Sequence, residues 1–397
     1  MSYYQSKRSD RYGRPRSSGR SFGGSRGPKK DYIHPSKFVR SAKPLTEDVY
    51  VSQHKFSDFA LNPLIQTNLT AMGFSDPSPI QDQTVPAGLS GRDVVGIAST
   101  GTGKTAAFAL PLLNRLMTER GSRAIILAPT RELAQQIDEQ CRQLAKGSGI
   151  SGALLIGGVA MGPQLKDLRY NPSIIIGTPG RIRDHIERKS LDLSTCNIVV
   201  LDEVDRMLDM GFLTDITFIL GRTNTVKQSF YFSATLDSRV KAIIEGFSRD
   251  PVMVSVKAGE TSENVEQNVV TFSSASDKID KLHSLLISDT VVKTLVFDDT
   301  HRSVEKLATE LGARGFSTDS IHGGKSQAQR QRALKKFRDN QIKVLVATDV
   351  AARGLDVSDI THVINYSSPQ SYDDYIHRIG RTGRAGKIGY ALTFVEQ

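Results

Sequence analysis

The stretch that most constrains this chain is a glycine-rich loop at residues 98–105, Ala-Ser-Thr-Gly-Thr-Gly-Lys-Thr. It follows an apolar run at 94–97 and precedes a second apolar run at 106–110, so the pattern predicts a strand, a loop and a helix in that order. Gly101 and Gly103 can take positive φ angles and let backbone N–H groups approach an anion. The N-terminus of the following helix adds a partial positive charge. The stretch therefore predicts a phosphate-binding loop rather than a glycine-rich connector.

The side chains that end this loop match the chemistry of a bound nucleotide. Lys104 is placed to reach the β- and γ-phosphates, and the Thr105 hydroxyl is placed to ligate Mg²⁺. Ala98 stands where the strict G-x-x-x-x-G-K-[ST] pattern has its first glycine. The predicted nucleotide-binding residues of the loop are Thr100, Gly101, Thr102, Gly103, Lys104 and Thr105.

Short apolar runs alternate with helical patterns along most of the chain, and this alternation predicts the fold class. Runs without internal alternation are typical of strands buried on both faces, which means parallel sheets covered by helices. A polar stretch at 258–266 is read as a linker, so we expect two α/β domains in tandem at 44–257 and 267–397, only the first with a phosphate-binding loop. The predicted strands are 94–97, 124–128, 153–156, 174–176, 198–201 and 229–232, then 294–297, 317–321, 343–347, 362–366 and 390–394.

The first 43 residues hold all the excess positive charge of the chain, whose formal net charge is +10. They contain 12 Lys and Arg against two acidic residues, among Ser, Gly and scattered aromatics. Such a segment buries too little apolar surface to offset its ordering entropy, so we expect a disordered basic tail. Basic groups beside phosphates and aromatics that stack on bases favour a non-specific nucleic-acid tether. A solubilising tail and an organellar transit peptide are the alternatives, and the glycines and prolines argue against the amphipathic helix of the latter.

The remaining composition predicts a cytoplasmic protein. No run of 18 apolar residues and no signal-peptide core is present, so we expect no membrane association. Cys141 and Cys196 fit neither a disulfide framework nor a metal site and are expected to be reduced, buried thiols. The chain ends just past its last predicted strand, and we expect no folded C-terminal module there.

Two carboxylates, Asp202 and Glu203, directly follow the apolar run at 198–201. At the carboxyl edge of a parallel sheet, beside the phosphate-binding loop, Asp202 is placed to hold Mg²⁺ through water. Glu203 is placed to polarise the attacking water as a general base. The alternative is a strand that simply ends in solvated acids.

These carboxylates open a tetrapeptide, Asp-Glu-Val-Asp at 202–205, that resembles the signature of the DEAD-box RNA helicases, with Val204 where that family usually has Ala. Further family motifs follow in order. They are Gly-Phe-Ser-Asp-Pro-Ser-Pro-Ile-Gln at 73–81, Pro-Thr-Arg-Glu-Leu at 129–133, Gly-Gly at 157–158, Thr-Pro-Gly-Arg at 178–181, Ser-Ala-Thr at 233–235, Gln-Ala-Gln-Arg at 327–330, Ala-Thr-Asp at 347–349, Ala-Arg-Gly-Leu-Asp at 352–356 and His-Arg-Ile-Gly-Arg-Thr-Gly-Arg at 377–384. The resemblance implies two RecA-like domains, ATP and Mg²⁺ as cofactors, and RNA as the partner.

The resemblance also implies roles around the nucleotide. Gln81 has the donor and acceptor that match adenine N6 and N7, and it is expected to select ATP. Phe56 is expected to stack on the base, although alone it would pass for a core residue. Gly354 and Asp356 complete the implied nucleotide-binding set.

The implied catalytic set joins the two domains. Ser233 and Thr235 carry the hydroxyls that the family uses to couple Asp205 to the second domain, and His377 is the member of its motif expected to link to Asp205 and Ser233. Arg381 and Arg384 resemble arginine fingers, which can be worth roughly 10³–10⁵ in rate. They lie in the domain without a phosphate-binding loop, so hydrolysis is expected to wait for domain closure. The alternative for this motif is a basic solvated loop.

RNA is the ligand expected to close the domains. The residues that match family contacts to the sugar–phosphate backbone are Pro129, Thr130, Arg131, Gly157, Gly158, Thr178, Gly180 and Arg181 in the first domain and Gln327, Arg330 and Thr348 in the second. Backbone contacts position a strand without reading its sequence, so we expect low sequence specificity. Preference for RNA over DNA requires sensing of the 2′-OH, which only the resemblance implies.

The function predicted from the sequence is an ATP-dependent RNA helicase that locally melts short duplexes and remodels RNA–protein complexes such as ribosomal precursors, working as a monomer. One rival is an ATP-gated RNA clamp with little turnover, because Val204 adds two methyl groups behind the catalytic carboxylates, where overpacking costs about 1–3 kcal/mol. The other rival is a DNA-directed motor, which DNA-stimulated hydrolysis and directional translocation would reveal.

Overall fold

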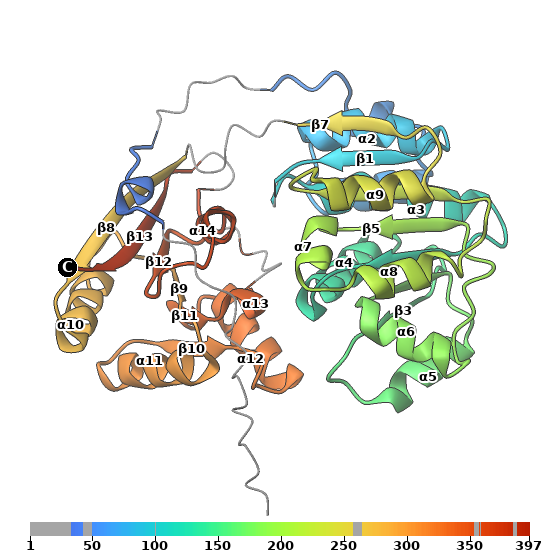
Figure 1. Cartoon of the computed structure of the whole chain (residues 1–397). Coiled ribbons are helices and arrows are strands. Elements are labelled where there is room, and N and C mark those ends of the chain that lie inside the picture. The colour runs from blue at the N-terminus through green and yellow to red at the C-terminus, as the bar shows by residue number, and fades with distance from the viewer. Residues whose placement is uncertain are drawn as a thin grey trace, which may run out of the picture.

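The structure is a computed structural model that describes residues 33–42, 50–99, 101–256, 264–352, 357, 359–383 and 387–397. Two α/β bodies follow one another along the chain, as predicted, and each is built on a parallel sheet covered by helices (Figure 1). Four of the predicted site residues lie outside the described residues, namely Thr100, Gly354, Asp356 and Arg384. So do the first 32 residues of the tail and most of the linker.

The first domain contains a seven-stranded sheet in the order β3-β4-β2-β5-β6-β1-β7, with every recorded strand pair parallel. The strands are β1 (Val94–Ile97), β2 (Ala124–Leu127), β3 (Gly152–Leu155), β4 (Ile174–Gly177), β5 (Ile198–Leu201), β6 (Gln228–Ser233) and β7 (Val252–Ser255). Its helices are η2 (Phe56–Asp58), α1 (Pro63–Ala71), α2 (Pro79–Leu89), α3 (Lys104–Thr118), α4 (Arg131–Leu144), α5 (Met161–Arg169), α6 (Pro179–Glu187), α7 (Val204–Asp209), α8 (Leu213–Leu220) and α9 (Ser238–Phe247).

The second domain contains a six-stranded parallel sheet in the order β10-β11-β9-β12-β13-β8. The strands are β8 (Val265–Phe272), β9 (Thr294–Phe297), β10 (Thr318–Ile321), β11 (Val344–Ala347), β12 (His362–Asn365) and β13 (Gly389–Glu396). The helices are α10 (Ala275–Leu286), α11 (His301–Ala313), α12 (Gln327–Arg338), α13 (Asp349–Ala352) and α14 (Tyr372–Ile379).

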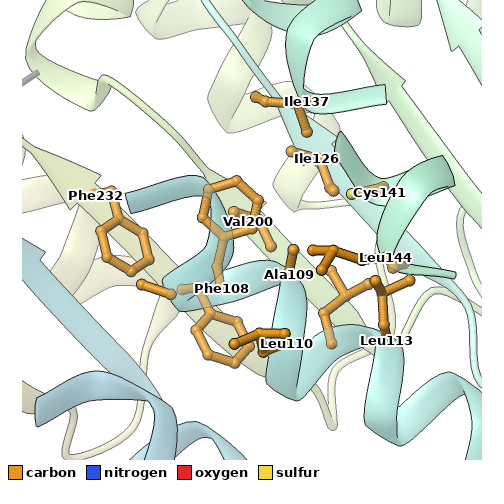
Figure 2. Packing of buried hydrophobic residues seen from close by; sticks show 14 of the residues in the cluster. Phe108, Ala109, Leu110, Leu113, Ile126, Ile137, Cys141, Leu144, Val200 and Phe232 are labelled. Atoms are coloured by element: carbon orange, nitrogen blue, oxygen red, sulfur yellow. The ribbon is translucent and has the colours of Figure 1, made fainter. Parts of the chain in front are cut away.

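Apolar strands with two buried faces explain why both sheets are sandwiched between helices. In the first domain, α1–α4 cover one face and α6–α9 cover the other. Figure 2 shows the first of these layers, where Phe108 and Leu113 of α3 pack beside Ile126 of β2 and Val200 of β5. In the second domain α10 and α11 cover one face, and α12 and α13 cover the other.

The parallel strands bring their carboxyl ends to one edge of each sheet, and that edge carries the predicted motifs. The phosphate-binding loop follows β1, and the segments beginning at Pro129, Thr178 and Asp202 follow β2, β4 and β5. In Figure 1 the arrowheads of β1 and β7 point toward the second domain. This edge is where ligands bind in open parallel sheets.

The structure differs from two predicted boundaries and contains two strands for which no prediction was made. Residues 33–42, assigned to the disordered tail, form an ordered segment that contains the short helix η1 (Pro35–Phe38) and packs on the second domain. The linker, predicted at 258–266, ends earlier because β8 begins at Val265. β7 and β8 were not predicted: the apolar run of β7 is only three residues long, and polar residues interrupt that of β8.

Cys141 and Cys196 are buried free thiols, as predicted. No helix in the described part of the chain is long and apolar enough to cross a membrane.

Candidate nucleotide and RNA site

The phosphate-binding loop has the geometry that its glycines predict. Gly101 and Gly103 adopt φ angles of 82° and 90°, in the left-handed region that favours glycine. Lys104 begins α3 and donates from Nζ to the carbonyl of Ala98 at 3.0 Å, so its buried ammonium is held across the mouth of the loop. Thr105 follows in the first turn of α3. Backbone N–H groups, a lysine and a hydroxyl therefore converge at one helix N-terminus.

Gln81 is locked against this loop from α2. Its Oε1 accepts from the Ser78 N–H at 2.9 Å, and its Nε2 donates to the Gly103 carbonyl at 3.0 Å. A side chain at Gly103 would displace the Gln81 amide, because an added Cβ would lie 2.3 Å from Gln81 Nε2. A glutamine amide offers two donors and two acceptor lone pairs, so one of each remains for a base.

Phe56 lies on the same side of the domain as Gln81 but is largely buried in this structure. Its ring meets Phe59 and Phe74 edge to face, with centroids 5.9 and 5.6 Å apart. The chain just before it is anchored to α2, since the Tyr50 hydroxyl donates to Asp82 Oδ2 at 2.6 Å. The segment that leads to Phe56 is therefore held at Asp82, the residue next to Gln81 in α2.

Asp202 and Glu203 are the buried acids at the end of β5. Burial raises the pKa of Asp202 to about 7, while the Lys104 charge lowers it and Glu203 raises it. Glu203 has φ 54°, and its Oε2 has no hydrogen-bond partner among the described residues. A left-handed non-glycine residue costs on the order of 1–3 kcal/mol and is typical of functional sites. Val204, next in the chain, is completely buried in the hydrophobic cluster beneath α6–α9.

Asp205 is tied to the Ser-Ala-Thr segment at the end of β6. Its Oδ2 accepts from the Ala234 N–H at 3.1 Å, the Thr235 N–H at 3.0 Å and the Thr235 hydroxyl at 3.1 Å. Its own N–H donates to Ser233 Oγ at 3.3 Å. A conformational change at Asp205 must therefore move the end of β6 as well.

The second domain contributes α14 and the turn that follows it. Arg378 is a structural residue: it donates to both carboxylate oxygens of Asp349, at 2.6 and 2.7 Å, and lies over the Phe297 ring. Arg381 is also buried, and His377 lines a small cavity together with Arg206 of the first domain and Arg381. The structure thus brings His377 to the domain boundary, beside Arg206.

The candidate RNA edge of the first domain is built around a glycine pair. Gly158 has φ 72°, and an added Cβ would lie 2.1 Å from Arg131 Nη1, so the guanidinium lies directly over this loop. Arg181 of α6 donates to the Val159 carbonyl at 3.1 Å from the other side. Two arginines from separate motifs therefore flank one loop, an arrangement suited to a phosphate backbone.

Two helix N-termini open at the same edge. Thr130 caps α4, its hydroxyl accepting from the Leu133 N–H at 3.2 Å, and Thr178 is the N-cap of α6. Pro129 precedes the first cap, and Gly180, in the first turn of α6, has open space where a side chain would be. Helix N-termini bind phosphate groups through their free N–H groups.

Gln327 and Arg330 make contacts that the sequence did not predict. Both side chains are buried against Glu132 of α4: Gln327 Nε2 donates to Oε1 at 3.2 Å, and Arg330 Nη2 lies 2.8 Å from Oε2. Burial lowers the pKa of Arg330 below its ordinary value, while Glu132 raises it. Thr348, at the end of β11, is buried with a hydroxyl that has no partner among the described residues. The interdomain role of Glu132 could have been suspected only from its position inside the Pro-Thr-Arg-Glu-Leu motif.

The family models agree with this division of the site. A model described as DEAD/DEAH box helicase matches residues 78–243, and one described as Helicase conserved C-terminal domain matches residues 277–386. The DEAD-box ATP-dependent RNA helicase CshA of Bacillus subtilis is 46% identical over 342 residues, which cover 86% of this chain and 69% of that protein. This chain belongs to the DEAD-box family of ATP-dependent RNA helicases. The resemblance predicted from the motifs is therefore confirmed.

Solved helicase structures show the same pair of domains. S. cerevisiae Dbp5 bound to RNA and ADP BeF3 has a TM-score of 0.77 at 32% identity, covering 86% of this chain and 89% of that one. A DEAD box protein from Methanococcus jannaschii has a TM-score of 0.53 at 38% identity, covering 87% of this chain and 94% of that one. The predicted RecA-like tandem fold is thus confirmed, together with the function class of an ATP-hydrolysing RNA helicase.

Proposed function

We propose that this DEAD-box helicase couples ATP hydrolysis to local unwinding of short RNA duplexes through a composite site shared by its two domains. The proposal rests on side chains that pair the two domains within or next to the predicted motifs. Glu132 contacts Gln327 and Arg330 at the RNA edge, and Arg206 Nη1 lies 3.9 Å from Asp374 Oδ1 beside the arginine-finger segment. Closure of the two domains therefore brings together the residues that contact RNA and those that contact ATP.

The nucleotide is held on the first domain. Lys104 and the N-terminus of α3 bind the phosphates, and Gln81 presents its remaining donor and acceptor to adenine. Phe56 covers the base once it turns from its pocket toward the site. ATP is preferred because this donor–acceptor pair matches the N6 and N7 edge of adenine.

The acidic pair fits a magnesium ion. Asp202 is buried with a raised pKa, and Glu203 Oε2 is buried without a partner among the described residues, so a divalent cation beside these carboxylates would offset the burial of their charge. Oxygen donors from Thr105 and Asp202 are the hard ligands that Mg²⁺ prefers. When bound, the ion neutralises charge on the β- and γ-phosphates.

Hydrolysis is then carried by side chains of both domains. Glu203 accepts a proton from the water that attacks the γ-phosphorus. Arg381, and Arg384 beyond it, stabilise the negative charge that develops on the transferred phosphoryl group. Asp205, through Ser233 and Thr235, senses whether the second domain is in place, and His377 joins this contact. Phosphate release reopens the domains and frees the RNA.

RNA lies across the carboxyl edges of both sheets. On the first domain, the RNA backbone is bound by Arg131, Arg181 and the helix N-termini at Thr130 and Thr178. On the second domain, it is bound by Thr348. Such contacts read no base sequence, so many RNAs are substrates and partners select the target. RNA–protein complexes such as ribosomal precursors are suitable targets for local, sequence-independent melting.

We also propose that the protein works as a monomer in the cytoplasm. Both domains needed for the composite site come from one chain, and the cysteines are unpaired and buried. Light scattering during size-exclusion chromatography tests the first statement.

Strand displacement tests the proposed function. A short RNA duplex with a single-stranded overhang should separate only with wild-type protein and ATP, whereas Arg381→Ala should bind the duplex without separating it. Separation by Arg381→Ala at the wild-type rate, or separation of a DNA duplex at that rate, would contradict the proposal.

A further inference from the structure

Residues 33–42, the strap, form a segment of the N-terminal region that lies on the second domain although the first domain follows it in the chain. In Figure 1 the strap is the blue helical turn beside β8 and β13. Its turn η1 (Pro35–Phe38) is capped by His34, whose Nδ1 accepts from the Ser36 N–H at 3.3 Å. A cap and a proline at the first position favour this turn independently of what it packs on.

The strap is held by its backbone along a sheet edge. β8 is the last strand of the second sheet, and the Arg40 N–H donates to the Gln267 carbonyl at 3.0 Å while the Gln267 N–H donates to the Arg40 carbonyl at 2.8 Å. The Ala42 N–H donates to Glu266 Oε2 at 2.7 Å. A paired edge is a specific attachment, since each bond satisfies a strand group that would otherwise face water.

Phe38 is the side chain that seats the strap. It is 2% exposed and packs in a cluster with Val265, Tyr375, Ile379 and Ala391. The Phe38 and Tyr375 rings have centroids 4.7 Å apart. Tyr375 in turn donates from its hydroxyl to Gln267 Oε1 at 2.9 Å. The same tyrosine therefore contacts both Phe38 and the β8 residue that pairs with Arg40.

The cluster seated by Phe38 supports the segment that bears the arginine fingers. Tyr375 and Ile379 belong to α14, which also carries His377, and Arg381 comes two residues after α14 ends. Val265 also lies against the turn that follows α14, because a Cβ added at Gly383 in that turn would lie 2.7 Å from Val265 Cγ2. The turn is therefore in close contact with the strand that the strap covers.

We propose that the strap is a positioning element for hydrolysis, with Phe38 as its positioning residue. It acts through α14 and Val265 to hold Arg381 where the γ-phosphate arrives on closure, without itself touching ATP or RNA. The inference rests on the proposed function, since it assigns Arg381 a catalytic task. A displacement of about 1 Å at a reacting group can cost on the order of 100-fold in rate. Packing of the strap behind the segment that carries Arg381 is therefore enough to control turnover.

Steady-state phosphate release by the full chain tests this, with ATP and single-stranded RNA as the probes. Phe38→Ala removes the ring, and Arg40→Pro removes the N–H that pairs with β8. Both should lower kcat by about 10- to 100-fold and leave KM for ATP and for RNA within about twofold. Val39→Ala, at an exposed neighbour, is the matched control and should retain wild-type kcat.

A double-mutant cycle separates positioning from general loss of stability. If Phe38 acts through the finger, Phe38→Ala should add nothing further to Arg381→Ala, because the group it positions is already gone. Phe38→Leu, which keeps an apolar side chain, should restore most of the kcat. Melting temperatures of all variants show whether the second domain stays folded at the assay temperature.

The outcomes are separable. Wild-type protein without RNA-stimulated hydrolysis would refute the proposed function itself. Stimulated wild-type protein with unchanged kcat in both Phe38→Ala and Arg40→Pro would refute the strap alone, as would a Phe38→Ala effect that multiplies with that of Arg381→Ala.

Discussion

Replacing Glu132 by Gln removes the charge that pairs the two domains at the RNA edge while keeping the shape of the side chain. Glu132 and Arg330 are 3% and 7% exposed, so solvent screens their 2.8 Å contact little. A contact to a charged partner contributes about 1.5–3 kcal/mol, and the pair exists only when the domains meet. Each 1.4 kcal/mol is tenfold, so the closure equilibrium should fall by about 10- to 100-fold.

RNA affinity measured by fluorescence anisotropy, with and without a non-hydrolysable ATP analogue, reports this change. With the analogue, the Kd of Glu132→Gln should rise by about 10- to 100-fold, since binding then requires closure. Without nucleotide it should be unchanged. Glu139→Gln, an exposed acid on the same helix, is the matched control. An equal loss of affinity in both nucleotide states would exclude a pair that acts only on closure, because it would mean that Glu132 contributes to RNA binding by the open protein.

Three other substitutions follow from the site. Gly158→Ala should weaken RNA binding at least about tenfold in filter-binding assays, because alanine is strained at a φ of 72° and its Cβ would displace Arg131. Retained affinity would show that this loop does not contact RNA. Asp205→Asn should keep ATP binding but uncouple hydrolysis from RNA, because the amide cannot accept all three hydrogen bonds from residues 234–235. RNA-stimulated phosphate release at the wild-type rate would contradict this. Gln81→Ala should raise the KM for ATP more than that for GTP, and an equal rise for both would remove Gln81 from base selection.

Much of the fold and site follows from local signals in the sequence. The glycine-rich loop before Lys104, the acids after β5 and the apolar runs predicted the sheet edge, because parallel strands buried on both faces leave only their carboxyl ends for chemistry. The family motifs implied that Ser233 and Thr235 couple Asp205 to the second domain, and the structure shows the hydrogen bonds that join Asp205 to residues 233–235 within the first domain.

The features that sequence analysis missed depend on contacts between distant segments. Glu132 and Arg330 are 198 positions apart, and nothing local to either predicts a buried pair. Phe38 lies in a strongly basic segment whose average composition indicated disorder. The turn η1 and the Phe38 ring are nevertheless enough to hold residues 33–42 against the β8 edge of the second sheet. β8 was missed because an edge strand covered on one side lacks a continuous apolar run.

Phosphate release from ATP with and without single-stranded RNA shows whether RNA closes the composite site. We expect strong stimulation by RNA and none by matched DNA. Glu203→Gln should abolish release while ATP-dependent RNA binding persists. Release that RNA does not stimulate, or that DNA stimulates equally, would contradict a composite site closed by RNA.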